Sequence, residues 1–177
     1  MNKKYILTNE IKEYHGYILH RIERVSDNLI GGWIENENNL SQCGDCFVYG
    51  NGQVCGNGIV CGNGQVCGNG RVYENGQVYG NGIVCGNGRV YGNGQVCGNG
   101  RVCGNGRLTT DIVNLTGLLF PISIVDNGLS IGCRWFTFTQ IKKLTNKQIA
   151  EIDNKALQFK KQFGPTIKQL LKALGKI

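Results

Sequence analysis

The chain has 177 residues, of which 28 are glycine and only two are proline, and its formal net charge is +7. Collagen needs glycine at every third position together with abundant proline, and a flexible glycine-rich linker has no fixed period, so the sequence excludes both classes. The glycines instead recur with valine every six residues, which indicates an ordered repeat.

The positive charge is unevenly distributed along the chain. Residues 110–177 contain ten Lys and Arg against four Asp and Glu, whereas residues 1–40 contain five against six. A basic region favours nucleic acid or an acidic protein as partner, although lysines along a helical pattern more often form a solvated face. This net positive charge argues against an acidic inhibitor that mimics DNA.

Nine cysteines raise the question of a disulfide scaffold. The count is odd, and the opening MNKKYILTNEIKEYHG has neither the apolar segment nor the cleavage site of a secretory signal. We therefore expect reduced thiols in a cytoplasmic protein. No stretch approaches 18 apolar residues, so we expect no membrane span and no membrane partner.

Residues 1–40 are predicted to form an N-terminal β cap. Short strands are expected from Tyr5 to Leu7, from Tyr17 to Arg24 and from Leu29 to Ile34, leading into the repeat. A stack of repeats cannot bury its own ends and needs capping segments. We expect the open end to be closed by three apolar side chains, Trp33, Ile34 and Leu40.

Residues 41–109 contain the repeat, in units of the form G-N-G-x-V-(Y/C). One register holds valine without a slip and ends in Leu108: Val48, Val54, Val60, Val66, Val72, Val78, Val84, Val90, Val96 and Val102. A unit of six residues is too short for a helix or a meander and fits one side of a coil. Three sides give a parallel β-helix with triangular coils of 18 residues.

Within each unit, neighbouring side chains of the extended piece point to opposite sides. Valine and the glycine two positions before it are predicted to face inward, and x and Tyr or Cys to face outward. The Gly-Asn pair forms the corner, where these residues adopt turn conformations at least cost. Glu74 stands where every other corner has glycine, and the sequence does not explain it.

Residues 110–177 are predicted to form a C-terminal hairpin and helices. Strands from Leu118 to Val125 and from Leu129 to Arg134 flank the turn signal Asp126-Asn127-Gly128. A helix is expected from about Thr139, with Thr145 as an N-cap and an apolar stripe of Ile149, Ile152, Ala156, Leu157 and Phe163. Gly164-Pro165 is expected to end it, before a second helix from Thr166 to Leu174. The outer side then carries Lys160, Lys161, Lys168, Lys172 and Lys176.

The repeat resembles the hexapeptide-repeat, left-handed β-helix proteins, and the left hand is implied by this resemblance. The flanking segments HGYILHRIERV, GGWIENENNLSQCGDCFVYGNG and LSIGCRWFTFTQI look like a family of phage and prophage hexapeptide-repeat proteins. The resemblance implies the fold, a viral origin and a location in the host cytoplasm. The biochemical function of that family is not established.

Catalytic and metal chemistry have weak support in the residues. Hexapeptide acyltransferases use a histidine base near the coils, whereas His15 and His20 both precede the first coil. The pair Cys43 and Cys46 forms a single CxxC, while a structural zinc site needs four ligands. Cys46 also occupies an inward position, where cysteine acts as a small apolar residue. We predict no catalytic residue, no metal site and no cofactor.

One outward surface combines cations with aromatic rings. Residues 18 apart stack on one another, which aligns a row of arginines beside tyrosines: Arg71, Tyr73, Arg89, Tyr91 and Arg107. Arginine binds phosphate or carboxylate with two N–H groups, and tyrosine offers a stacking face. The alternative is that the arginine stems only cover the rings. We take these five residues as the predicted binding site.

These observations favour a non-enzymatic binding or scaffold protein of a phage or prophage. Its expected partner is a host or phage protein, with a nucleotide or nucleic acid as alternative, and by analogy it acts as an anti-defence inhibitor. The alternative function is a hexapeptide-type acyltransferase, which needs a histidine at a subunit interface. Exposed apolar rows on the coils also favour a homo-oligomer.

Overall fold

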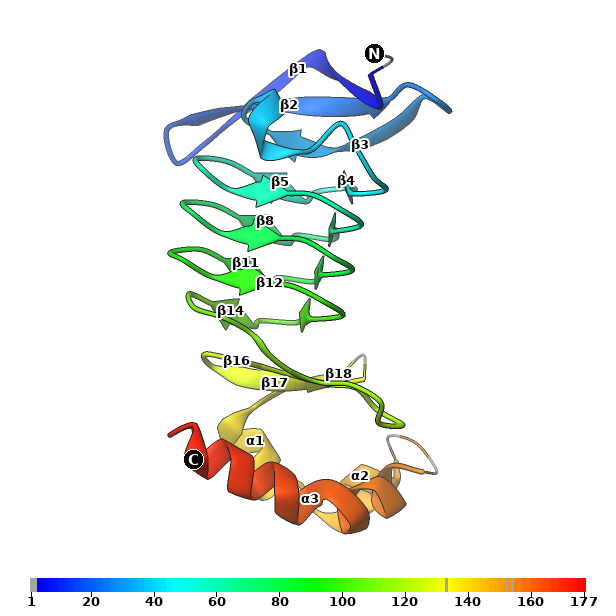
Figure 1. The fold of residues 1–177 in the computed structure, drawn as a ribbon, viewed down its shortest axis with the longest axis vertical. Coiled ribbons are helices and arrows are strands. Elements are labelled where there is room, and N and C mark those ends of the chain that lie inside the picture. Colours follow the sequence, from blue (N-terminus) through cyan, green and yellow to red (C-terminus); the bar gives the residue numbers. More distant parts are fainter. Residues whose placement is uncertain (1–2, 133, 152, 154) are drawn as a thin grey trace.

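The computed structural model describes residues 3–132, 134–151, 153 and 155–177. The molecule is a column with antiparallel strands at the N-terminal end, stacked coils in the middle, and a sheet with helices at the C-terminal end (Figure 1). The coils wind as a parallel β-helix with 18 residues per turn. The predicted fold class is therefore confirmed.

The coils consist of eleven two-residue strands that pair in parallel with the strand 18 residues away. They form three sheets, in the orders β5-β8-β11-β14, β4-β7-β10-β13 and β6-β9-β12. The strands are β4 Phe47–Val48, β5 Gln53–Val54, β6 Ile59–Val60, β7 Gln65–Val66, β8 Arg71–Val72, β9 Gln77–Val78, β10 Ile83–Val84, β11 Arg89–Val90, β12 Gln95–Val96, β13 Arg101–Val102 and β14 Arg107–Leu108.

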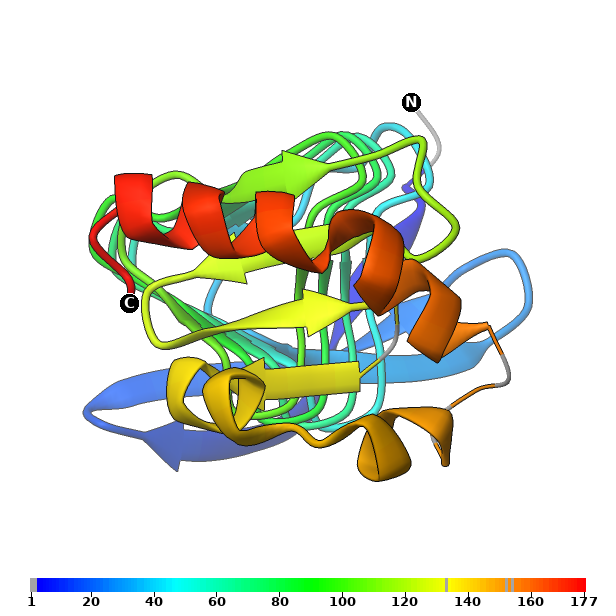
Figure 2. The ribbon, with the colours of Figure 1, turned by 90° about the horizontal axis from the view of Figure 1, so that it is seen from below.

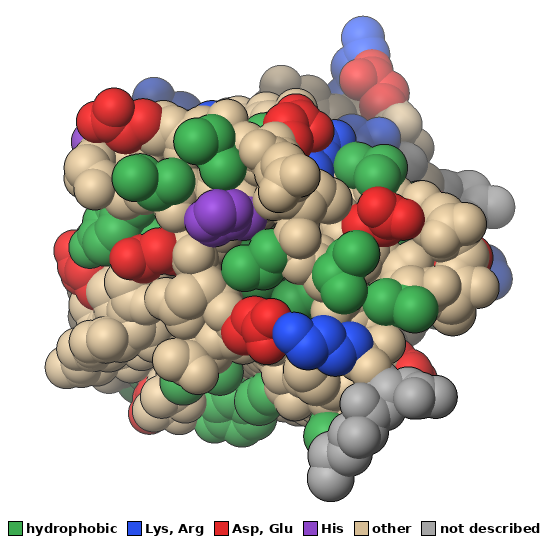
Figure 3. Space-filling view, turned by 90° about the horizontal axis from the view of Figure 1, so that it is seen from above, with side chains coloured by type: hydrophobic (Ala, Val, Ile, Leu, Met, Phe, Trp, Pro, Cys, Tyr) green, Lys and Arg blue, Asp and Glu red, His purple; other side chains and the backbone are tan. Residues whose placement is uncertain are grey.

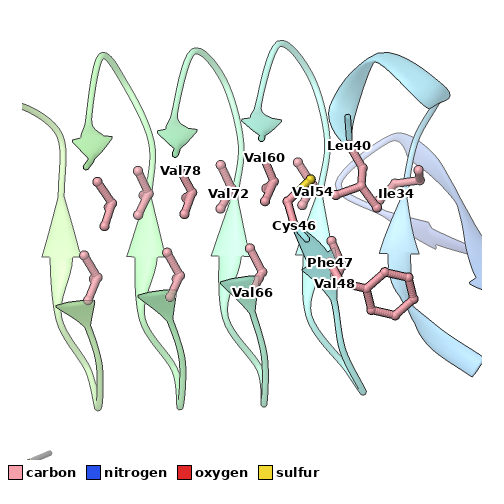
Figure 4. Packing of buried hydrophobic residues seen from close by; sticks show 14 of the residues in the cluster. Ile34, Leu40, Cys46, Phe47, Val48, Val54, Val60, Val66, Val72 and Val78 are labelled. Carbon is pink, nitrogen blue, oxygen red and sulfur yellow. The ribbon is translucent and has the colours of Figure 1, made fainter. Parts of the chain in front are cut away.

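The interior of the coils is a stack of valines, as predicted. Every repeat valine and Leu108 has 0% exposure, and the side chains lie one above another along the axis (Figure 4). Burying such a side chain stabilises the fold by about 1.5–3 kcal/mol. The inward glycines leave room for this stack, because a Cβ at Gly64 would lie 2.7 Å from the carbonyl oxygen of Val78.

Each corner of the triangle carries a ladder of asparagines. The Nδ2 of one asparagine donates to the Oδ1 of the next, one coil along, at 3.1–3.5 Å. Asparagine was predicted for its turn conformation, and these side-chain ladders add to that role. The three ladders are Asn51-Asn69-Asn87-Asn105, Asn57-Asn75-Asn93 and Asn63-Asn81-Asn99.

The N-terminal cap contains β1 (Tyr5–Tyr14), β2 (Tyr17–Arg24), β3 (Leu29–Ile34) and the 3-10 turn η1 (Glu37–Asn39). Strands β1 to β3 are antiparallel, and β3 then pairs in parallel with β5, so the cap extends one sheet of the coils. Ile34 and Leu40 close the end of the core as predicted. The prediction for Trp33 is wrong: it stacks on Gln53, on the outer side of the sheet.

The C-terminal region begins with a four-stranded antiparallel sheet of β15 (Val113–Leu115), β16 (Ile122–Val125), β17 (Gly128–Ile131) and β18 (Arg134–Thr137). The predicted hairpin at Asp126-Asn127 is confirmed, although its strands are shorter than expected. The sheet caps the last coil, because Asp126 Oδ2 accepts hydrogen bonds from the backbone N–H and the hydroxyl of Thr109 at 2.7 Å.

Three helices follow: α1 (Phe138–Lys143), α2 (Asn146–Ala150) and α3 (Ala156–Ala173). Thr145 is the N-cap of α2, as predicted, and forms a capping box with Gln148. The prediction that Gly164-Pro165 ends a helix is wrong, because α3 continues through both residues. Phe159, Ile167 and Leu171 are buried in one cluster with the sheet, and this packing outweighs the local preference. Ile152 of the predicted stripe lies outside the described residues.

Candidate anion-binding stripe

The predicted binding residues lie together on one face of the coils. Arg71, Arg89 and Arg107 stand side by side on β8, β11 and β14, in direct parallel register. Parallel strands are about 4.8 Å apart, so the three arginine side chains form a continuous row. The six-residue period fixes this arrangement, since three units bring the same position back to the same face.

The cap lengthens this row with residues that the sequence did not identify. Trp33 continues the row above Gln53, and two cations lie over its ring: Lys12 Nζ is 4.2 Å from the ring centroid and Arg21 Cζ is 4.9 Å from it. The guanidinium of Arg71 lies 4.9 Å from the ring of Tyr14. The register of β1 and β2 against β3 places these side chains, and no sequence motif signals it.

We call Lys12, Arg21, Arg71, Arg89 and Arg107 the cationic stripe. The ion pairs found among the described residues are Lys3–Glu37, Arg24–Asp27 and Lys176–Asp126, and none of them involves the stripe. The pKa of Lys12 is lowered, first by burial and then by the charges of Arg21 and Arg71, against a smaller opposing effect of the Glu10 carboxylate. The Nε atoms of Arg21 and Arg71 are buried and have no hydrogen-bond partner among the described residues. The stripe is thus a set of donors that repel one another.

A shallow groove of about 190 Å³ runs along the lower part of the stripe. One wall is the arginine row and the other is an asparagine ladder; the lining residues are Asn69, Arg71, Asn87, Arg89, Asn105 and Arg107. Guanidinium groups and side-chain amides are hydrogen-bond donors to carboxylate and phosphate oxygens. The groove therefore has the chemistry of a linear anion site.

The tyrosines beside the stripe stack on each other. The rings of Tyr73 and Tyr91 are nearly parallel, at an interplanar angle of 2°, with centroids 5.1 Å apart. The pKa of Tyr73 is raised, mainly by burial and then by Tyr91. Each ring covers one face of the other. The sequence led us to expect open stacking faces on these tyrosines, whereas a partner meets mainly the ring edges and the hydroxyl groups of the pair.

Two glutamates, one in the cap and one in the coils, accept hydrogen bonds from backbone N–H groups of the coils. Glu35 Oε2 accepts the backbone N–H of Gly56, and Glu74 Oε2 accepts that of Gly92, both at 2.7 Å. Glu74 has a φ of 55°, so it adopts the left-handed conformation of the glycines that it replaces. Its side chain hydrogen bond accounts for the single departure from the repeat.

The hairpin β1–β2 covers the upper end of the same face. Leu19, Trp33 and Cys55 form a small buried cluster, against which Tyr14, Tyr17 and Tyr73 pack. Cys55 and Gln53, which were expected to face outward, are consequently only 2% and 9% exposed. Burial raises the pKa of the Cys55 thiol to about 11.

Both histidines belong to the β1–β2 hairpin, and the CxxC segment lies in the loop between η1 and β4. His15 is in the turn between β1 and β2, and His20 is on β2, where it pairs with Ile34. Cys46 is fully buried, as predicted, and Lys4 Nζ donates to its carbonyl oxygen at 2.9 Å. Among the described residues, no three His, Cys, Asp or Glu side chains form a set that could hold a metal ion.

A second face carries the predicted row of stacked thiols. Cys85 Sγ contacts Cys103 Sγ at 2.8 Å. Its hydrogen bond with Cys103, more than burial, raises the pKa of Cys85 to about 11, and the pKa of Cys67 is raised by its hydrogen bond with Cys85. The raised pKa values keep the thiols of Cys67 and Cys85 neutral at physiological pH.

Comparison with models of protein families finds no match for this sequence, and comparison with the curated proteins finds no relative either. None of the helices among the described residues has the length and apolar character needed to cross a bilayer. The geometry of the stripe is therefore the main support for a functional proposal.

Proposed function

We propose that this chain is a non-enzymatic binding protein, encoded by a phage or prophage, that uses the cationic stripe to bind an anionic partner in the host cytoplasm. One observation carries the proposal: five cations share one face, and none of them pairs with a carboxylate in the described part of the chain. The viral origin rests on the resemblance of the flanking segments.

A row of like charges on neighbouring strands destabilises a sheet. In the stripe this cost is built into a rigid scaffold, because Arg71, Arg89 and Arg107 project from strands held by the valine core and the asparagine ladders. Carboxylates or phosphates of a partner would relieve the repulsion and form charge-assisted hydrogen bonds. The preformed row also lowers the entropy cost of binding.

The preferred partner is an acidic surface of a host protein. A nucleotide would bind best where a base could stack on an open aromatic face, whereas Tyr73 and Tyr91 stack on each other. A row of carboxylates needs only the donors of the groove. Inhibition of a host defence protein is the extension that the phage resemblance supports.

The proposal is tested by affinity capture of the tagged chain from lysate of phage-infected host cells, followed by mass spectrometry of the bound proteins and extracted small molecules. The informative variant is Arg89→Glu with Arg107→Glu. Arg101→Glu is the control for a charge reversal elsewhere on the coils, because Arg101 is exposed on β13, in a different sheet.

We expect one stoichiometric host protein that the double variant loses and Arg101→Glu retains. Recovery of a nucleotide instead would replace the protein partner by a nucleotide signal. Equal capture by the double variant, or capture of neither protein nor small molecule, would refute binding through the stripe.

The N-terminal end supports a further part of the proposal, a homo-oligomer. It exposes several apolar side chains among acidic ones (Figure 3). The most exposed are Ile6, Ile11, Ile18, Val25, Leu29 and Ile30, at 36–58%. Such a patch marks a contact surface, and a second copy is the simplest occupant. The test is the solution mass of wild type and of the double variant Ile11→Lys with Ile18→Lys. A monomeric wild type would exclude this interface.

A further inference from the structure

A large cavity lies at the C-terminal end, between the four-stranded sheet and the helices, on the side of the sheet away from the coils (Figure 1). Seen from below, α3 runs along one side of the sheet and α1 and α2 along the other, with β17 and β18 visible between them (Figure 2). The space that these elements enclose has a volume of about 1130 Å³. This is slightly above the range of about 300–1,000 Å³ that is typical of small-molecule sites.

The cavity exists because the helices do not cover the whole sheet. Four strands spaced about 4.8 Å apart make a sheet roughly 19 Å wide, and one helix with its side chains covers about 10–12 Å. In the described part of the chain α3 is the one long helix, since α1 and α2 have six and five residues. The apolar lining has two parts. The half-buried side chains on it are Phe120, Ile131, Phe136, Ile141 and Leu144, and its base is formed by the buried side chains Ile149, Phe159, Ile167 and Leu171.

The rim of the cavity is strongly basic. Six cations contribute to its lining, and Asp153 is the one acidic residue among the lining residues described. The cations are Arg134, Lys142, Lys160, Lys161, Lys168 and Lys172. An apolar wall with a basic rim is complementary to a molecule with a long apolar part and an anionic end. A second copy of the same rim would be repelled.

A hydrogen-bonded bridge favours a slender ligand over a partner helix. Lys160 Nζ on α3 donates to the carbonyl oxygen of Leu144 at 3.3 Å and to Oδ1 of Asn146 at 3.0 Å. The bridge ties α3 to the segment between α1 and α2, which closes the space at that point. A helix of about 10 Å diameter cannot lie along a groove that one side chain spans, whereas an acyl chain can enter from one side.

We infer that this cavity is a binding site for a long-chain fatty acid. The acyl chain lies against the apolar wall of the sheet and α3, and the carboxylate lies at the lysine rim, near Lys168 and Lys172. Burial of methylene groups supplies most of the affinity. The lysines fix the orientation and select against uncharged chains. This site is independent of the proposed stripe function.

The test uses the full chain and oleate, below the concentration at which oleate forms micelles. Native mass spectrometry reports stoichiometry, and displacement of a fluorescent fatty-acid probe reports affinity. Oleyl alcohol has the same chain without the charge. The variant is Lys168→Glu with Lys172→Glu, and the matched control is Lys147→Glu with Lys155→Glu, which changes two exposed lysines outside the cavity.

We expect one oleate per chain and weaker binding of oleyl alcohol by about tenfold, the equivalent of one charge-assisted contact. The affinity of the rim variant for oleate falls by about tenfold or more, and the affinity of the control variant stays within about twofold of wild type. Circular dichroism shows whether each variant is folded. The comparison of oleate with oleyl alcohol on wild type needs no variant.

Three results overturn the inference: no oleate complex, equal affinity for oleate and oleyl alcohol, or binding only to anionic phospholipid vesicles and not to monomeric oleate. Arg89→Glu with Arg107→Glu should bind oleate normally, so a failure of the stripe proposal leaves this result intact.

Discussion

The carboxylate of Glu74 accepts a hydrogen bond from the backbone N–H of Gly92, one coil below, at 2.7 Å. Glu74 is also the single repeat corner among the described residues in which a residue other than glycine has a positive φ, at 55°. The left-handed conformation costs about 1–2 kcal/mol for a residue with a Cβ. The side chain offsets that cost by satisfying a backbone donor of the next corner.

This relationship predicts different stabilities for two substitutions. Glu74→Ala keeps the backbone cost and loses the hydrogen bond, so we expect a loss of about 1–2 kcal/mol in the free energy of unfolding. Glu74→Gly loses the same bond but takes the conformation at little cost, so it should be more stable than Glu74→Ala. Urea unfolding measures both, and an alanine variant as stable as wild type would show that the bond contributes nothing.

The asparagine ladders are expected to stabilise the coils cooperatively. Asn81 accepts from Asn63 and donates to Asn99, both at 3.1 Å. Asn81→Ala removes both hydrogen bonds and should lower stability by about 1–3 kcal/mol, at about 0.5–1.5 kcal/mol for each bond. Asn38→Ala, at an exposed position outside the ladders, is the control for chemical denaturation. Equal effects of the two substitutions would argue against the ladders.

Two glycine-to-alanine substitutions should have opposite effects on the melting temperature. At Gly64 the new Cβ would lie 2.7 Å from the carbonyl oxygen of Val78, inside the packed core, so we expect a loss of more than about 1 kcal/mol. At Gly164, within α3, the nearest atom would be the flexible Lys160 side chain at 3.4 Å, and alanine should stabilise the helix by about 0.5–1 kcal/mol. Thermal unfolding by circular dichroism compares them, and a Gly64→Ala protein with an unchanged melting temperature would contradict the tight inner packing.

The buried thiol of Cys55 makes stability depend on pH in the alkaline range. Burial raises its pKa to about 11, from an ordinary value near 9. The unfolded chain therefore loses the thiol proton first, and the folded state becomes less stable as the pH rises from about 9 to 11. Below about pH 9 the group has no effect.

Cys55→Ala should flatten the fall in stability between pH 9 and 11, as measured by urea unfolding at a series of pH values. Cys43 is exposed, and Cys43→Ala serves as the comparison. In wild type, iodoacetamide at pH 8 should modify Cys43 before Cys55. An unchanged pH profile in Cys55→Ala would assign the fall to other groups.

The coils could be predicted from the sequence because their determinants are local and repeated. A six-residue period allows only one assignment of inward and outward positions. The place of a residue in the unit, such as Val72 or Gly70, therefore determines its environment. The same period placed Arg71, Arg89 and Arg107 in one row. Thr145 and the turn at Asp126-Asn127 were also predictable, because capping and turn chemistry depend on a few neighbouring residues.

The errors occurred where distant segments compete with local preference. Gly164-Pro165 disfavours a helix, yet the burial of Phe159, Ile167 and Leu171 on the sheet carries α3 through it. Trp33 was assigned to the end of the core because of its size, although the register of β3 against β5 turns it outward. Neither outcome follows from a sequence window, since each depends on which surface another segment covers.

The sequence by itself determined the β-helix, its valine core and the arginine row, because a strict period converts residue identity directly into position in space. The tertiary structure alone decided how the ends are used. Only the folded cap brings Lys12 and Arg21 to the row, and only the packing of one long helix on a four-stranded sheet leaves the C-terminal cavity open. The physical reason is that non-repeating segments find their places by burying apolar surface against partners far away in the chain.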